Sequence, residues 1–226
     1  MEVLTDVDVR VLGSLIEKEI TTPDNYPLSL NALVNACNQS SNRDPVVQYD
    51  EPTVKAAVDR LRRYSLVRSM QRSGERVMKY MHLAGEAMEI DRAQLAVLDV
   101  LMLRGPRTLG EIRTQAGRMY DFQSLGDVEA TLDGLATRAL EPLVTKLPRQ
   151  PGQKEARYAH LLSGEVSVET APAPTIERDR EPDRVPDRVP DREPDRVERL
   201  ERTVEELRGE LAVLRSEIAE LKRVFE

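Results

Sequence analysis

The sequence predicts a mainly α fold of the α+β type, in which two similar small domains precede a Pro-rich extended linker and a C-terminal coiled-coil helix. Three observations predict it: an internal repeat, a low aromatic content and a heptad pattern at the end of the chain. Aromatic residues make up 4% of the 226 residues and Trp is absent. The cores must therefore rest on aliphatic side chains, which suits packed helices better than a large sandwich.

The internal repeat is clearest in residues 52–66 and 126–140, which have the same apolar spacing. Both copies also end alike, at residues 79–83 and 157–161, so the repeat unit has about 75 to 80 residues and is a domain rather than a short solenoid element. The two copies differ in charge. Lys55, Arg60, Arg62 and Arg63 of the first copy are replaced by Glu129, Gly134, Ala136 and Thr137 in the second.

The first copy predicts three helices and a β-hairpin, in a domain of residues 1–88. A helix capped by Thr5 or Asp6 has apolar residues at helical spacing and ends before Thr21. Ser29 is a good N-cap for a second helix, and Pro52 opens a third. Two short runs, 68–72 and 76–83, then read as a hairpin. Three helices followed by a hairpin is the winged-helix order.

The second copy repeats this order in a domain of residues 89–162. Its expected helices are Ala93 to Arg104, Thr108 to Ala116 and Asp127 to Ala139, followed by a hairpin around residues 148–152. Thr108 and Glu111 have the spacing of a capping box. The sequence therefore predicts two winged-helix domains in tandem.

The composition changes abruptly at Ser163. Residues 182–197 repeat Pro-Asp-Arg-Val/Glu, and a helix cannot continue through a Pro at every fourth position. We therefore predict a disordered, charge-rich linker over residues 163–196.

Residues 197–226 alternate apolar spacings of three and four, which is typical of a coiled coil. Leu occupies every d position, which favours a parallel dimer. The expected dimerisation residues are Val197, Leu200, Val204, Leu207, Leu211, Leu214, Ile218 and Leu221, followed by Phe225.

The composition excludes several classes of protein. Cys37 is the single cysteine, which excludes an intramolecular disulfide framework and fits a reducing compartment. The N-terminus lacks the features of a signal peptide, and no stretch is apolar enough for a membrane span. We expect a cytoplasmic protein without a membrane contact. The net charge of -7 argues against general coating of a polyanion but leaves room for a local basic patch.

The run Thr21 to Val46, TTPDNYPLSLNALVNACNQSSNRDPV, closely resembles the signature of the YceH-like family of bacterial proteins. The likeness extends over about residues 1–162 and, more loosely, to the terminal heptads. The resemblance implies a tandem winged-helix fold in a bacterial cytoplasm, and it assigns no activity and no functional residue.

Charge is segregated within the first domain. Residues 1–52 have a net charge of -6, whereas residues 53–80 have a net charge of +6. In a helix-turn-helix protein the third helix enters the major groove and flanking elements contact phosphate. The expected DNA-binding residues are Lys55, Arg60, Arg62, Arg63, Arg68, Arg72, Arg76 and Lys79.

The alternative interpretation of this charge is a solvated basic face, or a face that docks on acidic residues of the other domain or of a partner. Asp50, Glu51 and Asp59 lie on or beside the same helix and would repel phosphate. In the second domain the corresponding helix carries Asp127, Glu129 and Asp133, a poor match to a polyanion. We expect that helix to contact another protein or to have no binding partner.

No motif for catalysis, a metal or a cofactor is present. His82 and His160 occupy equivalent places in the two copies and have no partner motif. Cys37 lies on the apolar face of its helix, where packing is favoured over reactivity. The sequence thus predicts a dimeric tandem winged-helix protein that binds duplex DNA, a candidate transcriptional regulator, rather than an enzyme. The alternative is a protein-interaction adaptor that uses its winged-helix domains without binding DNA.

Overall fold

The computed structural model describes residues 2–71, 77–149, 152, 153 and 155–164, which lie within one compact unit spanning residues 1–171. The chain has an α+β fold in which helices predominate and the sheets are small and antiparallel. Most of the predicted linker (163–196) and the whole predicted coiled-coil helix (197–226) lie outside the described residues, and so do Arg72 and Arg76.

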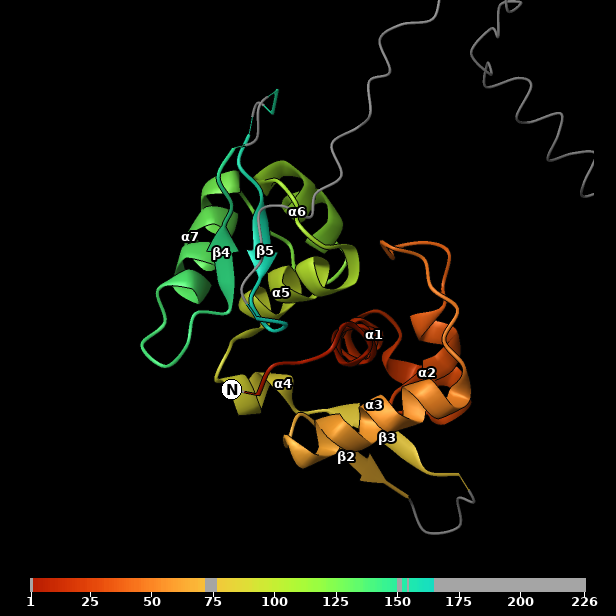
Figure 1. The fold of residues 1–226 in the computed structure, drawn as a ribbon. Helices are drawn as coiled ribbons and strands as arrows, with labels where there is room; N and C mark the ends of the chain where they lie inside the picture. Colours follow the sequence, from red (N-terminus) through yellow and green to blue (C-terminus); the bar gives the residue numbers. More distant parts are fainter. Residues whose placement is uncertain (1, 72–76, 150–151, 154, 165–226) are drawn as a thin grey trace, which may run out of the picture. The chain divides into compact units, whose positions relative to one another are not determined.

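The first part of the unit, called here the first segment, runs from the start of α1 to the end of β3 (Figure 1). The three predicted helices and the predicted hairpin are confirmed. Their bounds are α1 Asp6–Thr21, α2 Leu30–Cys37, α3 Glu51–Arg63, β2 Val67–Met70 and β3 Lys79–His82.

Two short elements extend this arrangement beyond what the sequence predicts. After the 3-10 turn η1, Pro23–Asn25, a two-residue strand β1, Leu28–Ser29, pairs with β3 and gives a sheet of order β1-β3-β2. In the β2–β3 pair, Val67 lies opposite His82. The short helix α4, Ala84–Met88, then leads out of the sheet.

The second segment runs from α5 to β5 and repeats the order of three helices and two strands. Its third helix begins and ends earlier than the sequence predicts, at Leu125 and Ala136. The bounds are α5 Arg92–Arg104, α6 Leu109–Ala116, α7 Leu125–Ala136, β4 Val144–Lys146 and β5 Tyr158–His160. The strands β4 and β5 pair antiparallel on either side of the predicted turn.

Side-chain caps explain where several of these helices begin. Thr5 caps α1, Ser29 caps α2 and Asp50 caps α3, each accepting a hydrogen bond from a backbone amide three residues later. Thr108 forms the predicted capping box with Glu111. Such caps satisfy amide groups that have no partner within the helix.

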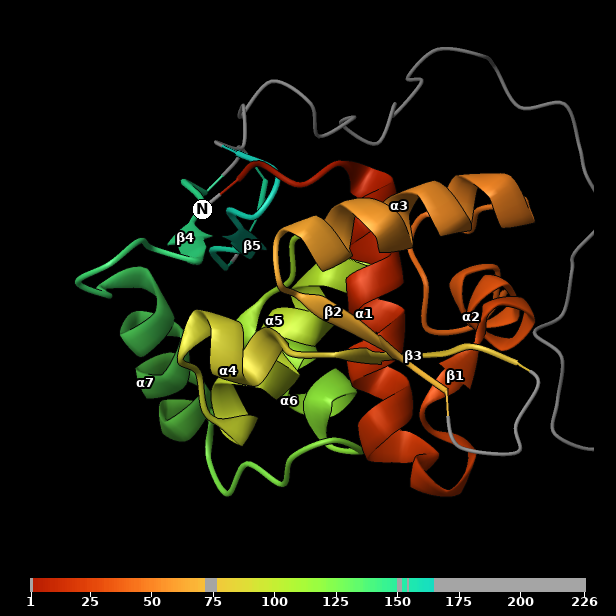
Figure 2. The same cartoon turned by 90° about the horizontal axis from the view of Figure 1, so that it is seen from below.

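The core lies around α1 and α5, which pack against each other. Figures 1 and 2 show α1 between α5 on one side and the helices α2 and α3 on the other. Every residue of α1 from Asp8 to Glu17 is buried, and so is every residue of α5 from Leu95 to Leu103. A helix that is buried all round lies in the middle of a core. The buried residues of the two segments form a single hydrophobic cluster.

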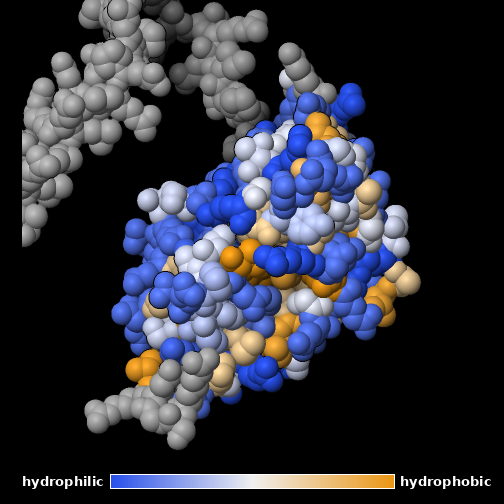
Figure 3. All heavy atoms as spheres, turned by 180° about the vertical axis from the view of Figure 1, so that it is seen from behind, coloured by the Kyte–Doolittle hydropathy of each residue, from blue (hydrophilic) through white to orange (hydrophobic). Residues whose placement is uncertain are grey.

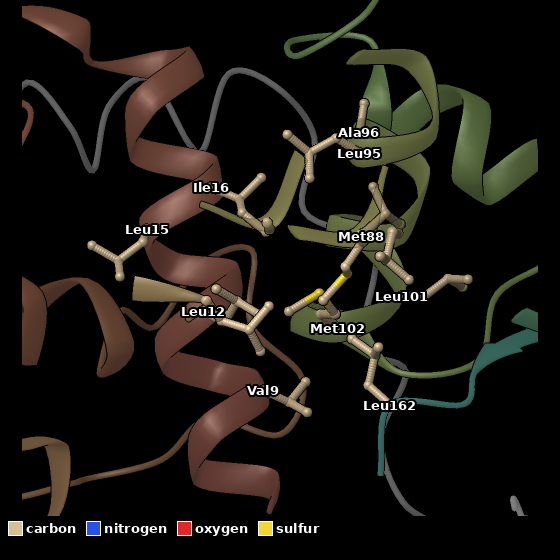
Figure 4. Packing of buried hydrophobic residues seen from close by; sticks show 14 of the residues in the cluster. Val9, Leu12, Leu15, Ile16, Met88, Leu95, Ala96, Leu101, Met102 and Leu162 are labelled. Carbon is tan, nitrogen blue, oxygen red and sulfur yellow. The ribbon is translucent and has the colours of Figure 1, made fainter. Parts of the chain in front are cut away.

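Side chains of α1 reach in both directions from this central position. Figure 4 shows Leu12 and Ile16 pointing toward Met88 and Met102, whereas Leu15 points to the opposite side of the helix. At Gly13 a Cβ atom would lie 2.9 Å from Leu103 Cδ2, so the absence of a side chain permits this close approach.

The surface combines polar and apolar regions. On the face drawn in Figure 3, hydrophobic side chains are exposed in a band across the middle, with hydrophilic residues on both sides.

Candidate nucleic-acid interface and the contact between the segments

The burial pattern of α3 determines which of its charges face outward. Val54, Ala57, Val58 and Leu61 are buried at helical spacing. The outward face consequently carries Lys55, Asp59, Arg62 and Arg63, and the last two are exposed. The structure thus brings three of the predicted DNA-binding residues to one face of one helix.

Asp59 lies between two of these cations and pairs with both. Lys55 Nζ is 2.5 Å from Asp59 Oδ2, and Arg62 Nη1 is 3.4 Å from Asp59 Oδ1. The hydrogen bond from Lys55, with the positive charges of both partners, lowers the pKa of Asp59. All three side chains are 40% or more exposed, so water screens these ion pairs and each contributes little to stability. A competing anion can therefore displace them at little cost.

Arg60 is placed differently, because it lies against α1. Its Nη2 is 2.9 Å and its Nε is 3.0 Å from Oδ1 of Asp8, a residue whose side chain is only 1% exposed. Asp8 is also the third residue of α1 and completes the capping box with Thr5. The guanidinium of Arg60 therefore neutralises a buried carboxylate of the same segment.

The hairpin beside α3 carries the remaining described cations of the predicted site. Arg68 is exposed on β2, with its Nη2 3.9 Å from Met81 Sδ, and Lys79 is half-buried on β3. Arg72 and Arg76 lie outside the described residues. Within the part of the chain that the structure describes, the predicted site consists of Lys55, Arg62, Arg63, Arg68 and Lys79, with Arg60 turned toward α1.

The equivalent helix of the second segment, α7, has the opposite charge. Asp127, Glu129 and Asp133 lie on it, and Asp127 forms a capping box with Ser124. Glu129 is 3.6 Å from Lys146 on β4. Leu125, in the first turn, is 47% exposed.

A buried ion cluster joins the two segments. Glu17 on α1 has a side chain that is 1% exposed, and its two oxygens bind different cations. Arg43, from the loop after α2, places Nη2 at 2.5 Å from Oε2, and Arg118, which follows α6, pairs with Oε1. Arg43 also donates to the backbone oxygen of Ala36 through both Nε and Nη2. These charge-assisted bonds offset the cost of burying the Glu17 carboxylate and the Arg43 guanidinium.

The same loop makes further contacts with the second segment. The amide of Asp44 donates to the backbone oxygen of Leu103 at 2.9 Å, and Arg107 Nη2 donates to Asp44 Oδ2 at 2.7 Å. Arg104 donates to Oδ1 of Asn42. Asn42, Arg43 and Asp44 belong to the run that resembles the YceH-like signature. The sequence did not show that Asn42 and Asp44 bind the second segment, or that Arg43 pairs with Glu17.

Asp99 lies within α5 at this contact and is fully buried. Among the described residues neither of its carboxyl oxygens has a hydrogen-bond partner. Burial raises the pKa of Asp99 well above its usual range, while the nearby charges of Arg43 and Arg104 oppose that shift. Burial therefore favours the protonated form of this carboxyl.

The single cysteine lies in the core, and the two histidines lie at the ends of strands. Cys37 is completely buried, and burial raises the pKa of its thiol to about 11. The expectation that Cys37 packs in the core is confirmed. His82 ends β3 and His160 ends β5, the equivalent places that the repeat predicts. Burial lowers the pKa of His160 to about 4. Across the described part of the chain, no group of three or more His, Cys, Asp or Glu side chains is arranged to hold a metal ion.

A family model described as "Protein of unknown function, DUF480" matches residues 4–153, which include α1 to α7 and the contact between the two segments. The chain belongs to the DUF480 family. The resemblance to an uncharacterised bacterial family is thereby confirmed.

Bacterial relatives extend the match beyond those residues. A UPF0502 protein of Opitutus terrae is 55% identical over 175 residues, which cover 77% of this chain and 76% of the relative. A UPF0502 protein of Pelobacter propionicus is 49% identical over 224 residues, 99% of each chain. One from Solibacter usitatus is 45% identical over 224 residues, 99% of this chain and 95% of the relative. No helix among the described residues is long and apolar enough to cross a membrane.

Proposed function

We propose that this protein binds duplex DNA as a tandem winged-helix protein, with α3 as the recognition helix and the β2–β3 hairpin as the wing. The order of three helices and a hairpin in each segment supports the winged-helix interpretation. In that fold class the third helix enters the major groove and its neighbours contact the phosphate backbone. A role as a transcriptional regulator is part of the proposal.

The observation that carries the proposal is the outward face of α3. Lys55, Arg62 and Arg63 lie on it, and Arg68 is exposed on the adjacent strand β2. Asp59 has to release Lys55 and Arg62 when phosphate binds, which costs little because these ion pairs are exposed. Arg60 is left out of the contact set, because its guanidinium pairs with Asp8.

Dimerisation is the second part of the proposal. The heptads of residues 197–226 favour a parallel coiled coil. Such a dimer would hold two weakly binding copies of α3 and its hairpin together and raise their effective concentration at the DNA. Exchanging Leu207 and Leu214 for Glu should then give monomers in sedimentation, and an unchanged mass would contradict this part.

The test of DNA binding is a salt-titrated shift assay with the full chain and random duplex DNA. With about four phosphate contacts, raising the salt fourfold should weaken binding about 100-fold. Arg63→Glu should weaken binding at least tenfold at low salt, and adding Arg62→Glu should remove what remains.

Arg92→Glu is the matched control for Arg63→Glu, since it makes the same change of charge at an exposed helical position away from α3. It should bind nearly as well as the unchanged protein. Equal losses in the two variants would show that net charge alone matters, and binding that ignores both salt and Arg63 would end the proposal.

A second candidate function is a protein-interaction adaptor, and the charge of α7 favours it. Asp127, Glu129 and Asp133 make this helix unsuited to DNA, while Leu125 beside them is 47% exposed. An acidic helix with an exposed apolar residue suits a basic protein partner better than a nucleic acid. A specific protein recovered from nuclease-treated lysate with the unchanged chain, and lost with Leu125→Asp, would support the adaptor. Recovery only through DNA would count against it.

A further inference from the structure

A groove of about 590 Å³ lies where the C-terminal end of α1 meets the end of β3, α4 and the start of α5. Its wall is largely hydrophobic, with contributions from Ile20, Leu83, Ile90 and Leu95. The volume lies in the range of small-molecule sites, which are mostly apolar with a few well-placed polar groups. None of the residues expected to contact DNA lines this groove.

A carboxylate in this groove is held in a fixed position by a buried histidine. The backbone amide of Ala84 donates to Nδ1 of His82 at 3.2 Å, so Nε2 carries the proton and donates to Glu19 Oε2 at 2.7 Å. The backbone amide of His82 in turn donates to Oη of Tyr26 at 2.7 Å. The bond from His82 engages one oxygen of Glu19, whose side chain is 40% exposed, and leaves the other oxygen as an acceptor.

The charges around the groove are mainly negative. Glu19, Glu86 and Asp91 line it, against the single cation Arg92. Burial lowers the pKa of His82, so this ring stays neutral at neutral pH and adds no positive charge. Among the described residues, neither Glu86 nor Asp91 takes part in an ion pair. The groove therefore combines an apolar wall with an uncompensated charge of -2.

We propose that this groove binds a small organic cation, an ammonium or guanidinium group carried on a hydrophobic body. The apolar body would pack against Ile90 and Leu95, and the cation would receive hydrogen-bond acceptors from Glu19 and attraction from Glu86 and Asp91. The carboxylates exclude anionic ligands from the same place. The fixed geometry of Glu19 reduces the entropy lost on binding.

The test compares three probes with the same phenyl body and different charge on the isotope-labelled full chain. Phenethylamine is cationic, phenethyl alcohol is neutral and hydrocinnamate is anionic. In an NMR titration phenethylamine should shift the amides of residues 81–86 and 90–95, and it should bind about tenfold more tightly than the alcohol. Hydrocinnamate should bind most weakly. Equal affinities for the three probes, or no shift of these amides by phenethylamine, would overturn the proposal.

Charge-neutralising variants provide a second, independent measurement. Glu86→Gln with Asp91→Asn removes two charges, and Asn preserves the cap that Asp91 provides to α5. This double variant should lose about tenfold in affinity for phenethylamine with an unchanged affinity for the alcohol. Glu129→Gln with Asp133→Asn, on α7, makes the same change of charge outside the groove and should lose nothing. An equal loss in the two double variants would mean that the whole molecule, and not the groove, attracts the amine.

Discussion

Two sets of charged residues differ in burial and in how firmly their partners hold them. One set lies at the contact between the two segments, and the other lies on the outward face of α3. Glu17 and Arg43 have side chains that are 1% and 0% exposed and are held by several hydrogen bonds. Arg62 is 46% exposed and makes one ion pair at 3.4 Å. The first set can be changed only by disturbing the core, whereas the second set can exchange partners.

The most distinctive run of the sequence therefore supplies contacts within the fold rather than exposed charge. The run that resembles the family signature contributes Asp44, which ties the loop after α2 to the second segment, and Arg43, which pairs with Glu17 in the interior. The less distinctive basic stretch that follows supplies the exposed cations. Arg60 is the exception in that stretch, because it serves the interior by pairing with Asp8.

The largest effect is expected from removing the buried cation. Arg43→Met should lower the free energy of unfolding by about 3 kcal/mol or more, because Glu17 loses a partner in a buried site. Arg107→Met is the matched control, since Arg107 pairs with an exposed carboxylate of Asp44 and should cost about 1 kcal/mol or less. Urea unfolding of both variants measures the difference. Equal losses in the free energy of unfolding would mean that the buried ion cluster contributes no more to stability than a surface ion pair.

The next effect is a change in pH dependence at Asp99. Its pKa is raised in the folded protein by burial, so at intermediate pH the folded state binds a proton that the unfolded state has released. Its contribution to stability is present below the unfolded pKa of about 3.9 and is lost as pH rises toward the folded value. Asp99→Asn cannot ionise and should lose less stability than the unchanged protein as the pH rises above about 4. Parallel stability profiles from urea unfolding would contradict a raised pKa of Asp99 in the folded protein.

The smallest effect should separate two neighbouring arginines of α3. Arg60→Gln should lower the free energy of unfolding by about 1 to 2 kcal/mol, because Asp8 is buried and loses its cation. Arg63→Gln, at an exposed position, should change it by less than about 0.5 kcal/mol. Thermal unfolding gives the stabilities and the shift assay gives the DNA affinities. Loss of DNA affinity in Arg63→Gln but not in Arg60→Gln would support this division between interior and exposed charges. Loss in Arg60→Gln but not in Arg63→Gln would contradict it.

Local signals in the sequence predicted most of the fold. Thr5, Ser29 and Thr108 cap helices as their residue types indicate, since capping depends only on neighbours three residues away. The strand β1 was missed because it has two residues and exists through its pairing with β3, about fifty residues later. No local pattern encodes such a pairing.

The candidate site was predictable in part for the same reason. The sequence predicted the helix α3 and its cations Lys55, Arg62 and Arg63, and the structure places these three on one face. The partner of Arg60 could not be foreseen, because Asp8 lies 52 residues away along the chain. The groove beside His82 carries no sequence motif, since two distant stretches of the chain, 19–23 and 81–95, form it.

The position of α1 and α5 has a practical consequence for dissecting the molecule. The middle of each helix, residues 8–17 of α1 and 95–103 of α5, is buried on all sides, and the two helices pack against each other. A fragment cut near residue 90 would expose the apolar flank of α1 to water, and the complementary fragment would expose that of α5. Both pieces would tend to aggregate or to associate with each other. The role of either segment is therefore better studied with substitutions in the intact chain than with truncations.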